Sequence, residues 1–322
     1  MPRLLVAGKL HPSGVALLKD LEGRGVDIDY VEEVSESSYA HLIAKADALV
    51  IRTQRLSAAT IAKAENLKVV SRHGVGYDSV DLEALNARKI ALTIVGDVNS
   101  ISVAEHAMSQ LLAGAKRTLQ ADRAVREPAL WGWRNGLEQQ EISGKNLLIL
   151  GFGRIGRHLA RMASGFDMQI RAVDPLLERS GWPEGSVRPV SLEEGLAWAD
   201  FISIHVPRGE RPAIGAEEIA RMKRGVILAN TARGGVVCEA ALSQALYSGQ
   251  VAAAGVDVFN EEPPVSGSAL FGHQNAILSP HIAGLTAECG ERMAIASIEN
   301  AMNFLAGTID PGLIVNREVL PA

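Results

Sequence analysis

The chain has few cysteines, few aromatic residues and no long hydrophobic run. Only Cys238 and Cys289 occur among its 322 residues, too few for a disulfide framework or a cysteine-based metal site. No segment approaches the roughly 20 consecutive apolar residues that cross a bilayer. The apolar start, Met1–Ala7, is too short for a signal peptide and is typical of a first β-strand. We therefore expect a cytoplasmic protein with no metal site and no membrane partner.

Positive charge is not in excess either. The 32 Lys and Arg residues are outnumbered by 37 Asp and Glu residues, and the formal net charge is −5. This balance gives no reason to expect a nucleic-acid partner. An anionic substrate would need a local cationic site, because the overall field does not attract it.

Aliphatic residues and glycine are abundant, as expected for parallel strands that are covered on both faces. Short β-branched runs alternate with helical patterns, which indicates βαβ units. The length favours two domains. We predict an α/β fold of two doubly wound, Rossmann-like parallel-sheet lobes joined by long helices. The predicted strands are Arg3–Ala7, Val26–Val31, Ala48–Ile51, Lys68–Ser71 and Ala91–Val95, then Asn146–Leu150, Gln169–Val173, Phe201–His205, Val226–Asn230, Ala252–Val256 and Ala276–Leu278.

A long helix is predicted between the two sets of strands. It covers Ile101–Leu119, and Ser102 with Glu105 would form a capping box at its start. The segment from Glu288 onward begins with a helical pattern and has no strands of its own. It could pack back on the first lobe, which would make that lobe discontinuous.

The strongest local motif is the glycine-rich loop Gly151–Gly156, which follows a predicted strand and opens a helix. A dinucleotide site needs a tight turn at Gly151, no side chain at Gly153 where backbone meets the pyrophosphate, and close packing at Gly156. Asp174, about 20 residues on, could bind both ribose hydroxyls and favours NAD over NADP. The alternative is a structural glycine-rich turn beside an aspartate at a strand end.

Polar residues follow several predicted strands of the second set. His281, Arg233, Asp257 and Glu262 each come at or after a strand end, where ligands bind in open α/β sheets. Reduction of a 2-keto acid needs a proton donor such as His, an Arg fork for the carboxylate, and an acidic partner that holds the imidazole tautomer. Each residue taken singly could also be an ordinary loop residue.

Together these residues resemble the D-isomer-specific 2-hydroxyacid dehydrogenase family over nearly the whole chain. The motifs that carry the resemblance are Arg72–Asp81, Asn99–Glu105, Gly151–Gly156, Asn230–Gly235, Gly255–Phe259 with Glu262-Pro263, and Ser279–Gly284.

The resemblance implies a role for each matched residue. His281 would be the acid/base, Glu262 its carboxylate partner, and Arg233 the group that binds and polarises the substrate. The amides of Val75 and Gly76 would hold the substrate carboxylate, and Arg52 would face the 3-substituent. The implied cofactor residues are Gly151, Gly153, Arg154, Ile155, Gly156, Asp174, His205, Val206, Pro207, Thr231, Ala232, Arg233, Asp257, His281 and Gly284.

The resemblance also implies how the chain is organised. Residues 1–98 plus 288–322 would bind the substrate and residues 99–287 would bind NAD, within a homodimer that meets through the long helix and Trp131–Trp133. Because the chain ends at Ala322, we expect it to lack the C-terminal regulatory domain of longer members.

The sequence departs from the family pattern at two places of interest. The segment Arg208–Pro212 replaces a threonine-containing stretch, and its two arginines leave room for NADP. His73 stands where a small residue is usual. It could tune the choice of substrate, or it could be a surface histidine.

These features predict an NAD-dependent oxidoreductase that transfers a hydride between nicotinamide and C2 of a small anionic D-2-hydroxy or 2-keto acid, of the 3-phosphoglycerate or glycerate/hydroxypyruvate type. Two alternatives remain open: oxidation of formate or phosphite on the same scaffold, and an NAD-sensing binding protein similar to a corepressor. Arg52 could bind a phosphate, a sulfonate or a second carboxylate, or simply cap a strand end.

Overall fold

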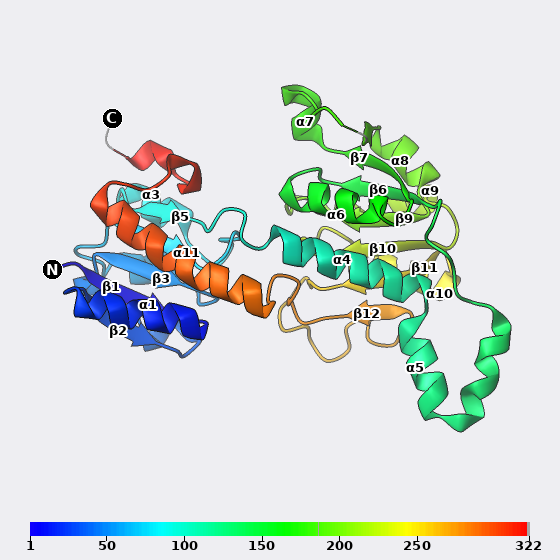
Figure 1. The fold of residues 1–322 in the computed structure, drawn as a ribbon, viewed down its shortest axis with the longest axis horizontal. Coiled ribbons are helices and arrows are strands. Elements are labelled where there is room, and N and C mark those ends of the chain that lie inside the picture. The colour runs from blue at the N-terminus through cyan, green and yellow to red at the C-terminus, as the bar shows by residue number, and fades with distance from the viewer. Residues whose placement is uncertain (186, 321–322) are drawn as a thin grey trace. The chain divides into compact units, whose positions relative to one another are not determined.

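The computed structural model describes residues 1–185 and 187–320, and the chain divides into two compact units. Unit 1 comprises Met1–Asn99 and Leu285–Ala322, and unit 2 comprises Ser100–Gly284. The chain therefore passes between the units twice. Each passage is followed closely by a long helix, α4 (Ser100–Ala115) in unit 2 and α11 (Ala287–Ala306) in unit 1 (Figure 1).

Unit 1 contains one parallel sheet in the order β2-β1-β3-β4-β5. Because β1 lies between β2 and β3, the strand order reverses between β1 and β3. The strands are β1 (Arg3–Ala7), β2 (Asp27–Val31), β3 (Ala48–Ile51), β4 (Val69–Arg72) and β5 (Ala91–Thr93). The other elements are α1 (Pro12–Gly23), α2 (Ala58–Ile61), α3 (Leu82–Ala87) and the short 3₁₀ helices η1 (Glu36–Ser38), η2 (Ile43–Lys45), η4 (Pro311–Leu313) and η5 (Arg317–Val319).

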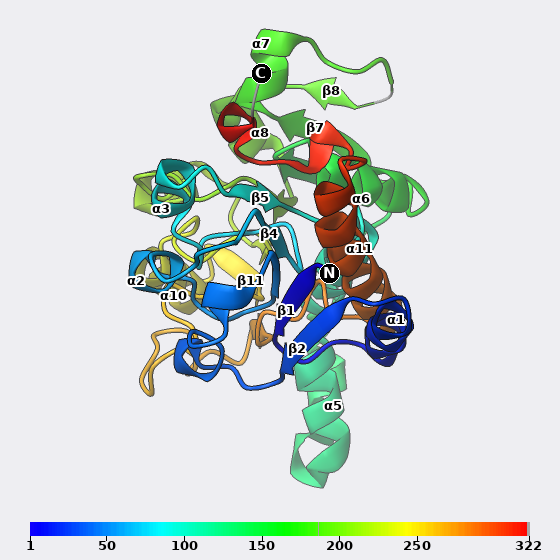
Figure 2. The same cartoon turned by 90° about the vertical axis from the view of Figure 1, so that its left-hand side faces the viewer.

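Alternation along the strands of unit 1 sends side chains to two opposite cores. Leu4 and Val6 of β1 pack with Ala294 and Ile298 of α11, on the face that α1 also covers (Figure 2). Leu5 packs on the other face, with residues of η2, α2 and α3. The segment after residue 284 thus supplies part of the core beneath the first strands.

Unit 2 contains seven parallel strands in the order β12-β11-β10-β9-β6-β7-β8, which reverses between β6 and β9. The strands are β6 (Asn146–Leu150), β7 (Gln169–Val173), β8 (Arg188–Pro189), β9 (Phe201–Ile204), β10 (Val226–Asn230), β11 (Val251–Val256) and β12 (Ala276–Leu278). The remaining elements are α5 (Thr118–Arg126), η3 (Pro128–Gly136), α6 (Arg154–Ser164), α7 (Pro175–Ser180), α8 (Leu192–Trp198), α9 (Ala216–Arg221) and α10 (Glu239–Ser248).

Helices cover both faces of the unit 2 sheet. On one face α4 and α6 pack side by side, and Met108 and Leu159 join Ile149 in one core (Figure 1). On the other face Leu196 and Leu242 of α8 and α10 join a second core. Both sheets are therefore doubly wound, and the predicted α/β class of two Rossmann-like lobes is confirmed.

The predicted helix Ile101–Leu119 is wrong in its bounds. α4 begins at Ser100, so Ser102 is buried inside the first turn and does not occupy the N-cap position. α4 ends at Ala115, and Arg117 adopts a left-handed φ of 51° before α5 begins. The Arg117 guanidinium donates to the carbonyl of Ala252 at 2.6 Å. This contact belongs to the tertiary structure and has no local sequence signal.

After this break, α5 and η3 form an arm, residues 118–136, that extends away from the unit 2 sheet (Figure 1). Ala124 is its one buried residue. Among the described residues, no helix is long and apolar enough to cross a membrane.

Candidate active site

The glycine-rich loop lies where the strand order of unit 2 reverses, between the carboxyl ends of β6 and β9. Gly151 has a left-handed φ of 91°, and a Cβ there would lie 2.7 Å from the carbonyl oxygen of His205. A Cβ on Gly156 would lie 2.3 Å from the carbonyl oxygen of Gly151, whereas one on Gly153 would meet no atom within 4 Å. Two of the glycines therefore allow close backbone packing, and the third leaves open space at the start of α6.

The amino end of α6 borders this open space. Arg154 is exposed and Ile155 is half-buried in the first turn, where helix amides favour an anion. Asp174 follows β7, and its carboxylate accepts hydrogen bonds from the amides of Phe152 at 2.9 Å and Leu176 at 3.0 Å. The same carboxylate caps α7 and ties this cap to the glycine-rich loop.

The turn after β9 carries the next predicted cofactor residues. His205 Nε2 is 2.9 Å from Ser203 Oγ, and half-buried Val206 and exposed Pro207 follow it. The guanidinium of Arg208 packs against Gly235, where a Cβ would lie 3.0 Å from its Nε. The arginine-containing loop therefore contacts the turn that follows β10.

The turn after β10 carries Thr231, Ala232 and Arg233. Asn230 holds it, because its side chain accepts from the amide of Ala232 and donates to the carbonyl of Arg233, both at 3.1 Å. The Arg233 guanidinium donates to the carbonyl of Ala232 at 2.7 Å. The hydroxyl of Thr231 is buried without a hydrogen-bond partner among the described residues. A buried, unpaired hydroxyl at a strand end fits a bound polar ligand.

Asp257 is fully buried at the end of β11. Its carboxylate accepts hydrogen bonds from Ser279 Oγ at 2.6 Å and from the amides of Ile282 and Ala283 at 2.9 Å each. Ser279 Oγ is in turn 2.9 Å from Nε2 of His106 on α4. The family resemblance implies a cofactor contact for Asp257, and the structure shows that its carboxylate also organises the loop of residues 279–284.

Ser279 and His106 were missed by the sequence analysis as members of this network. A signal existed in part, because Ser279 directly follows a predicted strand and His106 directly follows the Asn99–Glu105 motif. Nothing in the sequence indicates that the two side chains meet.

His281 and Glu262 are joined by a hydrogen bond at the carboxyl edge of the unit 2 sheet. His281 Nδ1 lies 2.7 Å from Glu262 Oε2, and Glu262 Oε1 accepts from the amide of Phe259 at 3.0 Å. The amide of His281 donates to the carbonyl of Asp257 at 2.8 Å. His281 has a left-handed φ of 53°, an uncommon and strained conformation for a residue other than glycine. The pairing leaves Nε2 of the imidazole for proton transfer.

The residues predicted for the substrate lie at the carboxyl edge of the other sheet, in unit 1. Val75 and Gly76 are half-buried in the loop after β4, and the structure gives neither amide a hydrogen-bond acceptor among the described residues. Arg52 follows β3 and donates to the carbonyl of Lys9 at 3.2 Å. His73 is buried, so its interpretation as a surface histidine is wrong.

The described residues contain no cluster of three or more potential metal ligands.

Residues 108–283 match the family model of the D-isomer specific 2-hydroxyacid dehydrogenase, NAD binding domain. The chain belongs to this family. The fit is structural as well, because the glycine-rich loop leaves open space at Gly153 and the buried hydroxyl of Thr231 is unpaired. NAD is the cofactor of this domain.

Similar proteins in the family align over nearly the whole chain. The chain is 37% identical to the D-3-phosphoglycerate dehydrogenase of Mycobacterium tuberculosis (strain ATCC 25618 / H37Rv) over 330 positions, which cover 100% of this chain and 61% of that protein. It is 36% identical to the glyoxylate reductase of Korarchaeum cryptofilum, covering 99% of this chain and 97% of that protein. The crystal structure of the TT0316 protein from Thermus thermophilus superposes with a TM-score of 0.87 at 31% identity, covering 97% and 99% of the two chains. The chain thus spans about three fifths of the length of its phosphoglycerate dehydrogenase relatives.

Proposed function

We propose that the protein is an NAD-dependent oxidoreductase that transfers a hydride between nicotinamide and C2 of a small D-2-hydroxy acid or its 2-keto acid. The observation that carries the proposal is the pair of His281 and Glu262, 2.7 Å apart, at the edge of the NAD-binding sheet where Arg233 also lies. The cofactor, when bound, supplies or accepts the hydride. The protein must supply the proton, the orientation and the charge complementarity.

In this mechanism His281 donates a proton from Nε2 to the keto oxygen during reduction and takes it back during oxidation. Glu262 bonds Nδ1, which fixes the tautomer and stabilises the imidazolium that forms. Arg233 binds the substrate and polarises its carbonyl, because a guanidinium can donate two parallel hydrogen bonds to oxygen atoms and carries a permanent positive charge. Asp257 acts through the backbone of the loop that carries His281.

We propose unit 2 as the NAD-binding domain and unit 1 as the substrate-binding domain. In unit 2 the pyrophosphate would lie at Gly153, Arg154 and Ile155, and the adenosine ribose at Asp174. The adenine would be bordered by His205, Val206 and Pro207, and the nicotinamide by Thr231, Ala232, Arg233, Asp257 and the residues from His281 to Gly284. In unit 1 the amides of Val75 and Gly76 would hold the substrate carboxylate, which is supported by their lack of other acceptors among the described residues.

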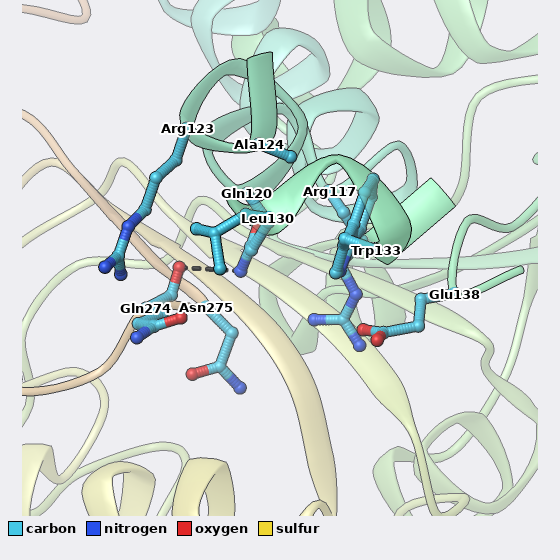
Figure 3. A pocket seen from close by; sticks show the side chains of 9 residues that line it. All are labelled: Arg117, Gln120, Arg123, Ala124, Leu130, Trp133, Glu138, Gln274 and Asn275. Atoms are coloured by element: carbon cyan, nitrogen blue, oxygen red, sulfur yellow. Dashed lines mark hydrogen bonds between the residues drawn. The ribbon is translucent and has the colours of Figure 1, made fainter. Parts of the chain in front are cut away.

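We propose that the protein is a homodimer that assembles through the arm at residues 118–136. Val125 and Trp131 of the arm are 67% and 56% exposed, an unusual apolar exposure for a segment that leaves the body of its domain. A pocket of about 480 Å³ lies beneath the arm, and Leu130 and Trp133 line it together with Arg117 and Gln274 (Figure 3). A second copy would cover this surface. Cys238 and Cys289 are not joined by a disulfide, which fits the reducing cytoplasm that we propose as the location of the protein.

The activity is tested by following NADH oxidation with hydroxypyruvate, glyoxylate, pyruvate, phosphohydroxypyruvate and sulfopyruvate, and by repeating each assay with NADPH. Turnover of formate or phosphite with NAD, and of none of these acids with NADH, would identify the other reaction class. NADH binding without any turnover would indicate a sensor protein.

The acid/base role is tested by His281→Ala. We expect kcat to fall by about 10²–10⁴-fold, the usual contribution of a positioned acid/base, while the Kd of NADH stays close to that of the wild type. His41→Ala, at an exposed histidine of unit 1, is the control and should be fully active. Near-normal turnover of His281→Ala would refute the assignment.

A further inference from the structure

Three residues form a row at the carboxyl edge of the unit 1 sheet. The row consists of the residues that directly follow three neighbouring strands: Gly8 after β1, Arg52 after β3 and His73 after β4. The last residues of these strands, Ala7, Ile51 and Arg72, are in register. The backbone continues the ladder through the row, because the amide of Arg52 donates to Ala7 at 3.0 Å and that of His73 to Ile51 at 2.8 Å.

The side chains of Arg52 and His73 share one face of this sheet, because alternate residues of a strand point to the same side. Ser71, two residues before His73, donates its hydroxyl to the carbonyl of Ser297 on α11 at 2.7 Å, so this is the face that α11 covers. The strand order of unit 1 reverses between β1 and β3, and ligands of open α/β sheets bind at such a reversal.

The imidazole of His73 is buried with one nitrogen unpaired. The residue is 6% exposed, and its Nε2 has no hydrogen-bond partner among the described residues. Buried polar atoms are almost always paired, because an unpaired one has lost its bonds to water. The loop that holds the Val75 and Gly76 amides begins at the next residue. An unpaired nitrogen at this place indicates a partner on the ligand.

The ring is neutral at pH 7. Burial, followed by the positive charge of Arg52, lowers the pKa of His73 to about 4, although a hydrogen bond to the carbonyl of His73 itself acts in the opposite direction. A neutral imidazole has one protonated nitrogen and one acceptor nitrogen, and we assign the proton to Nδ1, the nitrogen nearer the backbone, because a backbone contact raises the pKa of His73. Nε2 is then a hydrogen-bond acceptor.

A guanidinium and an acceptor nitrogen on neighbouring strands, with the charge of Arg52 acting on His73, fit one chemical group best. A hydroxyl accepts from the arginine and donates to the imidazole, so both are satisfied. A phosphate ester, a sulfonate or a carboxylate offers mainly acceptor oxygens near pH 7, and these would face the lone pair of Nε2. The third residue of the row, Gly8, has no side chain that would crowd Arg52. A Cβ at Gly8 would lie 2.7 Å from the Cβ of Arg52 and 3.0 Å from Oε1 of Gln54.

We propose that His73 is a specificity-determining residue, which accepts a hydrogen bond from the C3 hydroxyl of a 3-hydroxy-2-keto acid while Arg52 donates to the same hydroxyl oxygen. The substrate class is that of hydroxypyruvate and D-glycerate. The inference rests on the proposed function, and it selects among the substituents that Arg52 alone would accept.

The test compares kcat/KM for hydroxypyruvate and for pyruvate, which lacks the hydroxyl, with saturating NADH. The wild type should prefer hydroxypyruvate to pyruvate and to phosphohydroxypyruvate. His73→Ala should lose about 10–100-fold in kcat/KM for hydroxypyruvate, the scale of one hydroxyl contact, and change less than about twofold for pyruvate. His73→Gln should restore most of the preference, because its Oε1 is an acceptor. His41→Ala is the control and should leave both values unchanged.

The results of these assays distinguish a failure of the proposed role of His73 from a failure of the proposed oxidoreductase function. An unchanged ratio in His73→Ala, or a wild type that prefers phosphohydroxypyruvate, would overturn the inference and leave the proposed function standing. Absence of turnover with every 2-keto acid would overturn the proposed function and the substrate class together.

A second measurement needs no folded His73→Ala protein. In ¹⁵N-histidine-labelled wild type, the Nε2 resonance of His73, assigned by its loss in His73→Gln, should move on addition of D-glycerate with NADH present and stay in place with D-lactate. An equal response to the two acids would contradict the hydroxyl contact.

Discussion

At the scale of single residues, the carboxylates of Asp257 and Glu262 have different roles: the first holds a loop in place and the second bonds the imidazole of His281. Asp257 is fully buried, and the donors on its oxygens are the hydroxyl of Ser279 and two backbone amides. Such bonds to the charged form stabilise a carboxylate where no water reaches it. Glu262 is partly exposed and bonds an imidazole, so it can respond when the charge of His281 changes.

Asp174 is expected to select the cofactor. We predict that Asp174→Ser raises the Kd of NADH by about tenfold or more, the effect of one or two hydrogen bonds to a charged group, and weakens NADPH much less. Serine is the matched choice because it can still cap α7, whereas alanine would also destabilise that helix. Equal losses for the two cofactors, measured by fluorescence titration, would argue against a ribose contact.

His73 should also make stability depend on pH. Its pKa is about 4 in the folded protein and 6.5 as a free side chain, so below pH 6.5 the unfolded chain binds more protons and stability falls. The loss amounts to about 2 kcal/mol at pH 5 and is absent above pH 7. Urea denaturation at pH 5 and pH 7 should therefore show a larger decrease for the wild type than for His73→Gln. Parallel curves for the two proteins would show that His73 is not buried in neutral form.

Sequence patterns pointed to the candidate site residues because a strand end is visible in a sequence. The positions of Arg233, Asp257 and His281 followed from apolar runs that stop just before them, and the pairing of His281 with Glu262 was expected from the family resemblance. Burial and pairing across elements are different, because they depend on which strands become neighbours. The burial of His73 and the bond between His106 and Ser279 could not be predicted for that reason.

At the scale of elements, Gly153 just before α6 and Gly156 in its first turn should behave in opposite ways. Gly156→Ala places a Cβ 2.3 Å from a backbone oxygen, and we expect a cost of about 2–3 kcal/mol in unfolding free energy, as for other overpacked sites. Gly153→Ala meets no protein atom, so it should keep wild-type stability and lose NADH affinity. Thermal unfolding and NADH titration on both variants check this, and a Gly153→Ala protein that binds NADH normally would place the pyrophosphate elsewhere.

Most strands were predicted from the sequence with bounds close to those in the structure. β1, β3, β6, β7, β10 and β12 have the predicted bounds, because buried parallel strands are short, β-branched and sharply delimited by turns. β8 was missed, since Arg188–Pro189 is two residues long and exposed. The break between α4 and α5 was also missed, because no glycine or proline marks Arg117 and a contact with a distant strand fixes it.

At the scale of the whole molecule, the arm at residues 118–136 is expected to control assembly. We predict that Val125→Glu combined with Trp131→Glu converts the proposed dimer to a monomer in size-exclusion chromatography with light scattering, because two charges would be buried without partners. Tyr247→Glu is the matched control, since Tyr247 is 90% exposed on α10 and lies outside the arm. A double variant that keeps the wild-type mass would show that assembly uses another surface.

Unit 2 is continuous in the chain, whereas unit 1 is assembled from segments on either side of it. During translation the first strands of unit 1 leave the ribosome early, but Ala294, Ile298 and Ala301, which complete the core over Leu4 and Val6, are synthesised almost 300 residues later. At about 5–20 residues per second this is a wait of roughly 15–60 s. During that interval the nascent amino-terminal sheet has an uncovered apolar face, which chaperones would have to shield until α11 emerges.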